Sequence, residues 1–230
     1  MTAGGPLLVV DTATTRALVA LGSSDGSLRS ERSWVAGYRH GEELLLRIEG
    51  LLTDEAVTTD GLAGLIVGTG PGAFTGLRVG IATVKALAHA LRIPVVGVST
   101  GEALIAAAGV GQGVLLQPAG ASDVVLTRIG AAPRILAGGQ QPHLGPGETL
   151  LAVDLDGRAP ADAVDAGNVA REGLGGALVR AGAARLAVGD TDDLATLGPE
   201  YVTLPRGAHD EPASGGVELS GTASARGGTR

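Results

Sequence analysis

The first hundred residues alternate between short apolar runs and polar turns. Residues 7–10 and 17–22 are two such runs joined by a threonine-rich turn, which predicts a β-hairpin. A third strand is expected at 28–35. Residues 40–52 then carry Leu and Ile at helical spacing, so an amphipathic helix is predicted there.

The same pattern continues to about residue 108. The apolar run 62–67 is bounded by glycine and predicts a buried strand, and a helix is expected from 75 to 91. Residues 95–98 predict a further strand, and Ser99 is placed to cap a helix at 100–108. The order β-β-β-α-β-α-β-α predicts an α/β lobe with a mixed sheet.

The second half of the chain has a weaker pattern. Strands are expected near 113–117, 123–129, 134–137 and 149–153, and a helix is expected near 175–188. Residues 109–113 resemble a hinge, so we divide the chain into one lobe of residues 1–108 and a second of residues 109–205. Residues 206–230 have few large apolar side chains, and this tail is predicted to be disordered.

Composition narrows the classes of function. The chain has 230 residues, a formal net charge of −7, 2% aromatic residues and no cysteine. An acidic chain poor in aromatic rings is not expected to bind RNA by itself, because phosphates require Lys and Arg and bases require stacking rings. The lack of cysteine excludes disulfides and thiolate metal sites. Because the chain has neither an apolar run of about 18 residues nor a signal-peptide pattern, we expect a cytoplasmic protein without a membrane span.

The glycine-rich segment 68–76 is the most informative candidate site. It lies between a predicted strand and a predicted helix, so backbone N–H groups and the helix amino end would converge on one point, which suits an anion. Its spacing matches neither a Walker A loop nor a dinucleotide-binding fingerprint. The candidate contacts to an anion or nucleotide are Asp11, Thr12, Gly70, Gly72, Thr75, Gly76 and Arg78. The alternative, which these residues leave open, is a turn that needs glycine for close helix–strand packing.

Asp11 and His40 also have two explanations each. Asp11 is a candidate to face a phosphate through a metal or water, but an Asx-type turn that satisfies local backbone is the simpler explanation. His40 opens a helix beside two glutamates, yet no HxxxH or HExxH motif occurs in the chain. A solvated helix start is therefore expected at His40 rather than a metal site.

The helices at 40–52 and 75–91 are candidates for a partner interface. The second is apolar on nearly every side, so one side is expected to face its own sheet and another to face a further layer or a partner. An ordinary core helix is the alternative. The residues assigned to a partner interface are His40, Leu44, Leu45, Ile48, Leu52, Leu77, Ile81 and Lys85.

Four segments resemble one known family in both order and spacing. They are LLVVDTATTRALVAL (7–21), HGEELLLRIEGLL (40–52), GTGPGAFTGLRVGIATVKALAHALRIPVVGVST (68–100) and LGPEYVTLPR (197–206). The family is that of the TsaB-type (YeaZ-like) dimerisation subunits of the bacterial tRNA threonylcarbamoyladenosine complex, within the wider Gcp-like glycoprotease family. The resemblance implies the actin-like, sugar-kinase-like ATPase (ASKHA) fold with two lobes.

The resemblance also implies a function and partners. The chain is expected to be a non-catalytic scaffold that pairs, through its helices at 40–52 and 76–91, with a catalytic TsaD-type subunit, and a small P-loop ATPase of the TsaE type joins them. The complex modifies the adenosine next to the anticodon of ANN-decoding tRNAs, so tRNA is reached only through the complex. No cofactor of its own is expected, ATP or ADP is a candidate ligand at the subunit interface, and a homodimer is the candidate assembly of the chain alone.

Two enzymatic alternatives remain. An actin-like ATP-binding kinase or ATPase needs phosphate loops and an adenosine motif, which Asp11, residues 154–157 and the pair Gly175–Gly176 only weakly resemble. A metalloprotease needs a metal-binding constellation, and the sequence has no motif for one.

Overall fold

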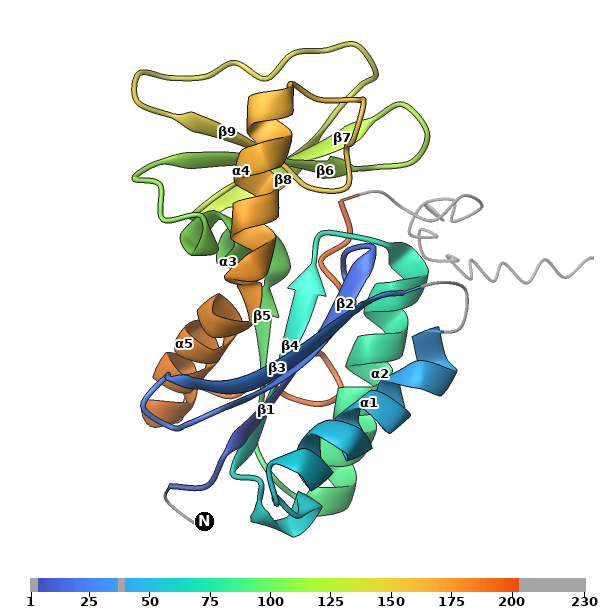
Figure 1. Ribbon diagram of the computed structural model, residues 1–230, viewed down its shortest axis with the longest axis vertical. Coiled ribbons are helices and arrows are strands. Elements are labelled where there is room, and N and C mark those ends of the chain that lie inside the picture. Colours follow the sequence, from blue (N-terminus) through green and yellow to red (C-terminus); the bar gives the residue numbers. More distant parts are fainter. Residues whose placement is uncertain (1–3, 37–39, 203–230) are drawn as a thin grey trace, which may run out of the picture.

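The predicted order of elements in the first hundred residues is confirmed. The structure is a computed structural model that describes residues 4–36 and 40–202 (Figure 1). The elements of this part are β1 (Leu7–Asp11), β2 (Arg16–Gly22), β3 (Leu28–Val35), α1 (His40–Asp54), the short 3-10 helix Thr59–Gly61, β4 (Gly64–Gly70), α2 (Phe74–Leu91), β5 (Val95–Ser99) and α3 (Thr100–Ala107). Ser99 caps α3 as predicted, since its hydroxyl accepts the Glu102 N–H at 3.4 Å.

The first sheet has the strand order β3-β2-β1-β4-β5. β1 pairs antiparallel with β2 and parallel with β4, so β1 lies at the centre of the sheet. All five residues of β1 are buried, because both faces of the sheet are covered. Leu8 and Val10 point to one face, which α1 and α2 cover, whereas Leu7 and Val9 point to the other, which α3 and α5 (Leu174–Ala187) cover.

A second sheet lies beyond α3. Its strands are β6 (Gly113–Pro118), β7 (Val124–Arg128), β8 (Ala131–Leu136) and β9 (Thr149–Ala152), in the order β8-β7-β6-β9. The four strands expected in this half are therefore present. The helix α4 (Ala161–Glu172), which we did not predict, packs on β9.

The chain returns to the first sheet after α4. The helix α5 contacts strands β1 to β5, although the sequence division placed residues 109–205 in the second lobe. Gly182 allows this approach, because a Cβ there would lie 2.4 Å from Ile66 Cδ1. The predicted disordered tail at 206–230 lies outside the described residues.

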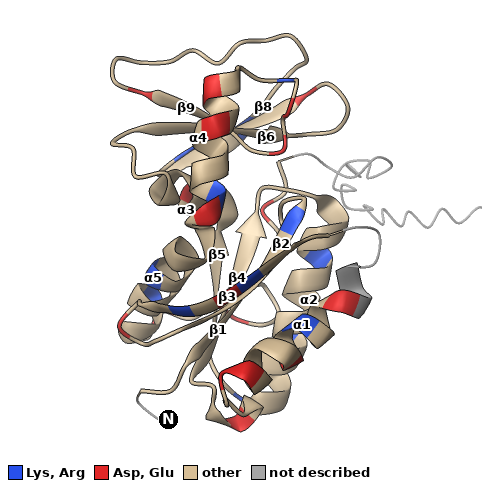
Figure 2. Cartoon of the chain, in the orientation of Figure 1, with Lys and Arg blue, Asp and Glu red and all other residues tan. Residues whose placement is uncertain are grey.

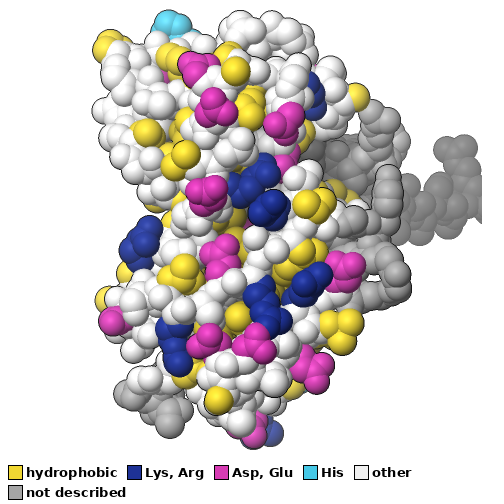
Figure 3. All heavy atoms as spheres, viewed as in Figure 1, with side chains coloured by type: hydrophobic (Ala, Val, Ile, Leu, Met, Phe, Trp, Pro, Cys, Tyr) yellow, Lys and Arg dark blue, Asp and Glu magenta, His cyan; other side chains and the backbone are white. Residues whose placement is uncertain are grey.

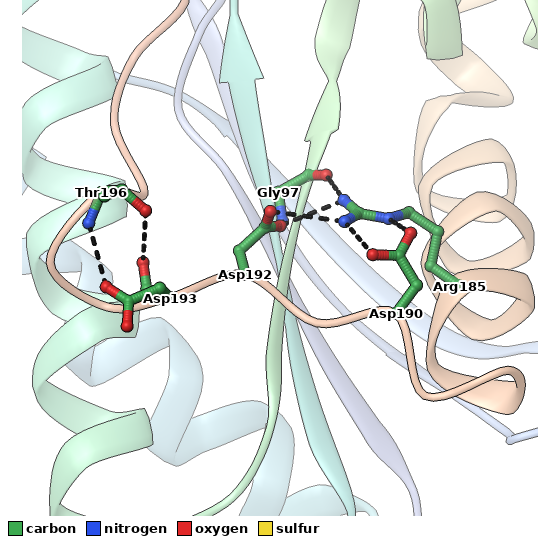
Figure 4. Close-up of polar contacts among 6 residues, drawn as sticks. All are labelled: Gly97, Arg185, Asp190, Asp192, Asp193 and Thr196. Carbon is green, nitrogen blue, oxygen red and sulfur yellow. Dashed lines mark hydrogen bonds and ion pairs between the residues drawn. The ribbon is translucent and has the colours of Figure 1, made fainter.

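A C-terminal strap, defined here as residues 190–201, crosses the edge strand β5. The Asp192 N–H donates to Val95 O at 2.9 Å, and Gly97 N–H donates to the Asp192 carboxylate at 2.7 Å (Figure 4). Arg185 donates to Gly97 O at 2.7 Å and pairs with Asp190 and Asp192. Backbone groups that β5 would otherwise expose at the sheet edge are thus satisfied by the strap and by Arg185.

Among the helices that the structure describes, none is long and apolar enough to cross a membrane.

Candidate functional site

The carboxyl end of β1 and the glycine-rich loop after β4 meet in a tightly packed junction. Ala73 N–H donates to Ala13 O at 2.7 Å, and the Thr12 hydroxyl donates to Gly76 O at 2.7 Å. A Cβ on Gly72 would lie 2.1 Å from Ala13 O. The loop and the turn of the first hairpin are therefore in direct backbone contact, which only glycine permits at position 72.

Asp11 lies buried at the centre of this junction. Its carboxylate accepts the Thr100 hydroxyl at 2.6 Å and the Ala13 N–H at 2.9 Å, so the predicted Asx-type turn is present. Gly70 N–H donates to the same Thr100 oxygen at 3.2 Å. Burial raises the pKa of Asp11 from 3.8 to about 6, and the hydrogen bonds from Thr100 and Ala13 only partly counter this rise.

The junction does not fit a phosphate at the residues predicted to bind one. The Ala73 N–H is already bonded, and a carboxylate lies where an anion would need positive charge. Arg78, the basic residue of the predicted set, points elsewhere: its Nε donates to Tyr201 Oη at 2.8 Å. Of the two explanations left open by the sequence, the geometry favours glycine for close packing at these positions.

The two weaker resemblances to a nucleotide site also belong to packed contacts. Asp154 accepts the backbone N–H of Thr15 at 2.8 Å and also its hydroxyl, and Arg171 donates to Asp154 at 2.7 Å. These bonds join the first hairpin to the loop after β9 and to α4. Gly175 lies within α5, where a Cβ would meet the Glu31 carboxylate at 1.9 Å.

Most of the side chains assigned to a partner interface lie in the protein's own core. Five of them are at most 5% exposed: Leu44, Ile48, Leu52, Leu77 and Ile81. Four of them, Leu44, Ile48, Leu52 and Ile81, pack with the strands of the first sheet in one cluster, so they offer a partner little surface. The His40 side chain lies outside the described residues, and the Lys85 Nζ donates to Leu197 O of the strap at 3.0 Å.

Leu45 is the predicted interface leucine that remains on the surface, with 55% of its area exposed. Arg47 lies 5.4 Å from the Trp34 ring, and a Cβ on Gly50 would meet Arg32, so that flank of α1 faces β3. On a helical wheel Leu45 is on the opposite flank, the one toward α2. Figure 1 shows α1 and α2 side by side on this face of the sheet.

The surface of α2 next to this flank is open and weakly polar. Its exposed positions include Thr75, Arg78, Ala82 and Ala86. α2 has basic residues and no acidic ones, whereas α1 carries acidic residues at both ends (Figure 2). Together, the exposed leucine and the small side chains of α2 form a face that a second protein's helix can approach.

An aromatic cluster at the end of the strap was missed from the sequence. Tyr201 stacks on Phe74 with ring centroids 5.2 Å apart, and the Arg78 guanidinium lies 4.0 Å from the Phe74 ring centroid. Phe74 is the one phenylalanine of the chain and Tyr201 one of two tyrosines. Their rarity, and the presence of Tyr201 in the LGPEYVTLPR segment, were the available signals.

Charge on the face of Figure 3 is mixed. Acidic and basic side chains are interspersed with apolar ones there, and no broad field of one sign covers that face. Within residues 4–36 and 40–202, no three His, Asp or Glu side chains are grouped so that they could hold a metal ion.

Sequence comparison matches less than half of the chain to known proteins. A family model described as "TsaD: tRNA N6-adenosine threonylcarbamoyltransferase" matches residues 34–138. The chain is 34% identical over 94 residues to the Escherichia coli protein "tRNA threonylcarbamoyladenosine biosynthesis protein TsaB", which is 41% of this chain and 40% of that protein. It is 42% identical over 101 residues to an uncharacterized Mycobacterium leprae protein, covering 43% of this chain and 28% of that protein. The chain thus spans less than half of the length of these relatives.

Structure comparison extends over more of the chain. "YeaZ from Pseudomonas aeruginosa" superposes with a TM-score of 0.65 and 22% identity, over 86% of this chain and 99% of that one. This match confirms the predicted fold class, an α/β fold with two mixed sheets flanked by helices. The similarities to TsaB and YeaZ proteins together confirm the resemblance drawn from the sequence.

Proposed function

We propose that this chain, part of which is similar to TsaB proteins, acts in the cytoplasm in tRNA threonylcarbamoyladenosine biosynthesis. Its role there is that of a non-catalytic scaffold that pairs with a TsaD-type catalytic subunit. The E. coli and Bacillus subtilis relatives carry the name of this pathway, and the TsaD family model matches the segment that contains α1 and α2. The chain itself reaches tRNA only through the complex, and a TsaE-type ATPase is the third member.

The observation that carries this proposal is the face formed by α1 and α2. It combines an exposed leucine at position 45 with small exposed side chains on the neighbouring helix, and it lies within the residues that the TsaD family model matches. Two related subunits that present the same helix pair can pack these faces against each other, as in the isologous interfaces of homodimers. A homodimer of the chain alone would use the same surface.

The role as a scaffold rather than an enzyme is supported by the junction around Asp11. The groups that an actin-like ATPase would use on phosphate are engaged in internal packing here, so ATP or ADP is proposed only at the interface with the partner. That proposal predicts nucleotide binding by the pair and not by the chain alone.

The experiment is size-exclusion chromatography with light scattering on the full chain mixed with the TsaD-type subunit of the same organism. The wild-type chain is expected to elute as a heterodimer, and Leu45→Asp is expected to abolish it, because an unpaired carboxylate would be buried at an apolar contact. Ile129→Asp is the matched control, since Ile129 is similarly exposed, at 60%, but lies in the second sheet's β7–β8 turn. A wild-type chain that stays separate from the partner, or a Leu45→Asp variant that pairs normally, contradicts the proposal.

A further inference from the structure

The C-terminal strap and α2 enclose a groove beside the α1–α2 face. The groove has a volume of about 480 Å³ and is lined by Arg78, Ile81, Ala82, Lys85, Leu197, Pro199 and Tyr201. Residues of α2 form one wall and residues of the strap form the other. Ala82 is exposed and lines the groove, and it also belongs to the small exposed side chains of the α1–α2 face, so the groove and that face share a residue.

The wall formed by the strap is fixed by contacts at several points. Leu197 is 8% exposed and packs into the core beneath α2, and Lys85 holds its carbonyl at 3.0 Å. Glu200 N–H donates to Thr69 O at 2.7 Å. Farther back, Arg185 fixes the start of the strap through Asp192 (Figure 4). A wall held in this way is preorganised, so a partner does not have to order it on binding.

The groove has a basic rim and an apolar floor. Ile81 and Leu197 form the floor, whereas Arg78 and Lys85, the single lysine of a chain with net charge −7, stand on the rim. Tyr201, 40% exposed, adds an aromatic surface at one end. Such a groove suits an apolar side chain that enters it while a neighbouring carboxylate faces the rim.

We propose that the strap is part of the partner-binding surface and that this groove receives an apolar side chain, flanked by a carboxylate, from a helix of the catalytic subunit. The proposal rests on the proposed function and adds to it the strap and the chemistry of the partner's contact. Two features support it: the groove is continuous with the α1–α2 face, and its basic rim contrasts with the acidic balance of the whole chain.

The test measures the dissociation constant of the full chain and the TsaD-type subunit by isothermal titration calorimetry. Ala82→Arg fills the groove with a residue that helices tolerate well, and it is expected to weaken binding at least tenfold. Ala181→Arg, at an exposed alanine of α5 on the opposite face of the sheet, is the matched control and is expected to bind like the wild type. Tyr201→Ala, which removes the aromatic end of the groove, is expected to weaken binding as well.

A second pair of variants tests the charge of the partner. Lys85→Gln and Lys85→Glu both remove the ammonium group that donates to Leu197 O, and the two new side chains have nearly the same shape, so the difference between them reports the charge at the rim. Lys85→Glu is expected to bind at least tenfold more weakly than Lys85→Gln at low salt, and the gap is expected to shrink at 0.5 M NaCl. A melting temperature near that of the wild type verifies that a variant is folded. If Ala82→Arg does not fold, Tyr201→Ala and the two lysine variants decide whether the groove contacts the partner.

The outcomes separate the two proposals. If Leu45→Asp abolishes pairing while Tyr201→Ala and both lysine variants bind like the wild type, the groove is not a contact and the scaffold function stands. If the wild-type chain does not pair at all, both the scaffold function and the groove's role are overturned.

Discussion

Replacing Asp11 with asparagine tests whether burying this charged carboxylate lowers the free energy of unfolding of the protein. The pKa of Asp11 is raised from 3.8 to about 6 because the side chain is fully buried. At about 1.4 kcal/mol for each factor of ten in proton affinity, that change corresponds to about 3 kcal/mol. The folded protein therefore binds this proton more tightly than the unfolded chain does.

The sign of the pH dependence follows from this. At pH values below the unfolded pKa of 3.8, Asp11 is protonated in both states and its burial carries no charge penalty. Stability is lost as the pH rises from 3.8 toward 6, and the full loss of about 3 kcal/mol is present at pH 7. Asparagine is neutral at every pH, so the Asp11→Asn variant does not lose this stability as the pH rises.

Asparagine also disturbs the hydrogen bonds at this position. It has one acceptor oxygen instead of two, so either Thr100 or Ala13 loses an acceptor, at a cost of about 1 kcal/mol. The variant is therefore expected to be about 0.5 kcal/mol less stable than the wild type at pH 4 and about 2 kcal/mol more stable at pH 7.

Urea unfolding of both proteins at pH 4, 5, 6 and 7 measures this difference. Comparing the two proteins at each pH removes the contributions of all other titrating groups that the substitution leaves unchanged. A difference in unfolding free energy that stays constant from pH 4 to pH 7 would refute the assignment of Asp11 as a buried carboxyl with a raised pKa.

Other predictions concern packing, the strap and chemistry. Gly72→Ala is expected to lower the unfolding free energy by about 3 kcal/mol, measured by urea titration, because its Cβ would lie 2.1 Å from the backbone oxygen of Ala13. Ile81→Asp is expected to unfold the protein, as measured by circular dichroism, because Ile81 is 4% exposed and its aspartate would be buried without a partner. Arg185→Ala is expected to cost about 1–2 kcal/mol through its lost bonds to Gly97 and Asp192, and to speed limited proteolysis within the strap. The purified chain alone is expected to show no ATP turnover above background, and turnover that Asp11→Asn abolishes would support the ATPase alternative instead.

The first sheet was predictable because its strands are short runs of Val, Leu and Ile bounded by glycine and polar turns. The helix α4 was not, because its buried positions are Ala163, Gly167 and Ala170. Such small side chains give almost no periodic signal in hydrophobicity, although they permit very close packing. A Cβ on Gly167 would lie 1.9 Å from Ala152 O, which shows how closely α4 approaches β9.

The sequence could predict which residues meet at the candidate site, but it could not predict how closely they pack. Asp11 and the loop at 68–76 follow neighbouring parallel strands, so the sequence could place them together. Whether they enclose an anion or touch each other depends on the distance between Gly72 and Ala13, which no local pattern encodes. The burial of five side chains assigned to the partner face could not be predicted for a similar reason. The leucines and isoleucine of α1 form one stripe in the sequence, whereas the sheet buries Leu44 and leaves Leu45 exposed.

The strap was beyond local reasoning altogether. Its charged contacts join Arg185 and Asp192 to Gly97, which lies about ninety positions earlier in the chain. Hydrogen bonds between a charged side chain and the backbone of a residue so far away in the sequence leave no periodic pattern.

The return of α5 to the first sheet sets a limit on how the protein can be made. One face of that sheet, with Val9 and Ile66 at its centre, is covered by residues 174–187. While the ribosome is still adding the second sheet, only α3 covers this face, and the apolar side chains that α5 will bury remain in water. The nascent chain is therefore expected to depend on chaperones until about four-fifths of it has been synthesised, and fragments that end before residue 174 are expected to be degraded rather than to fold.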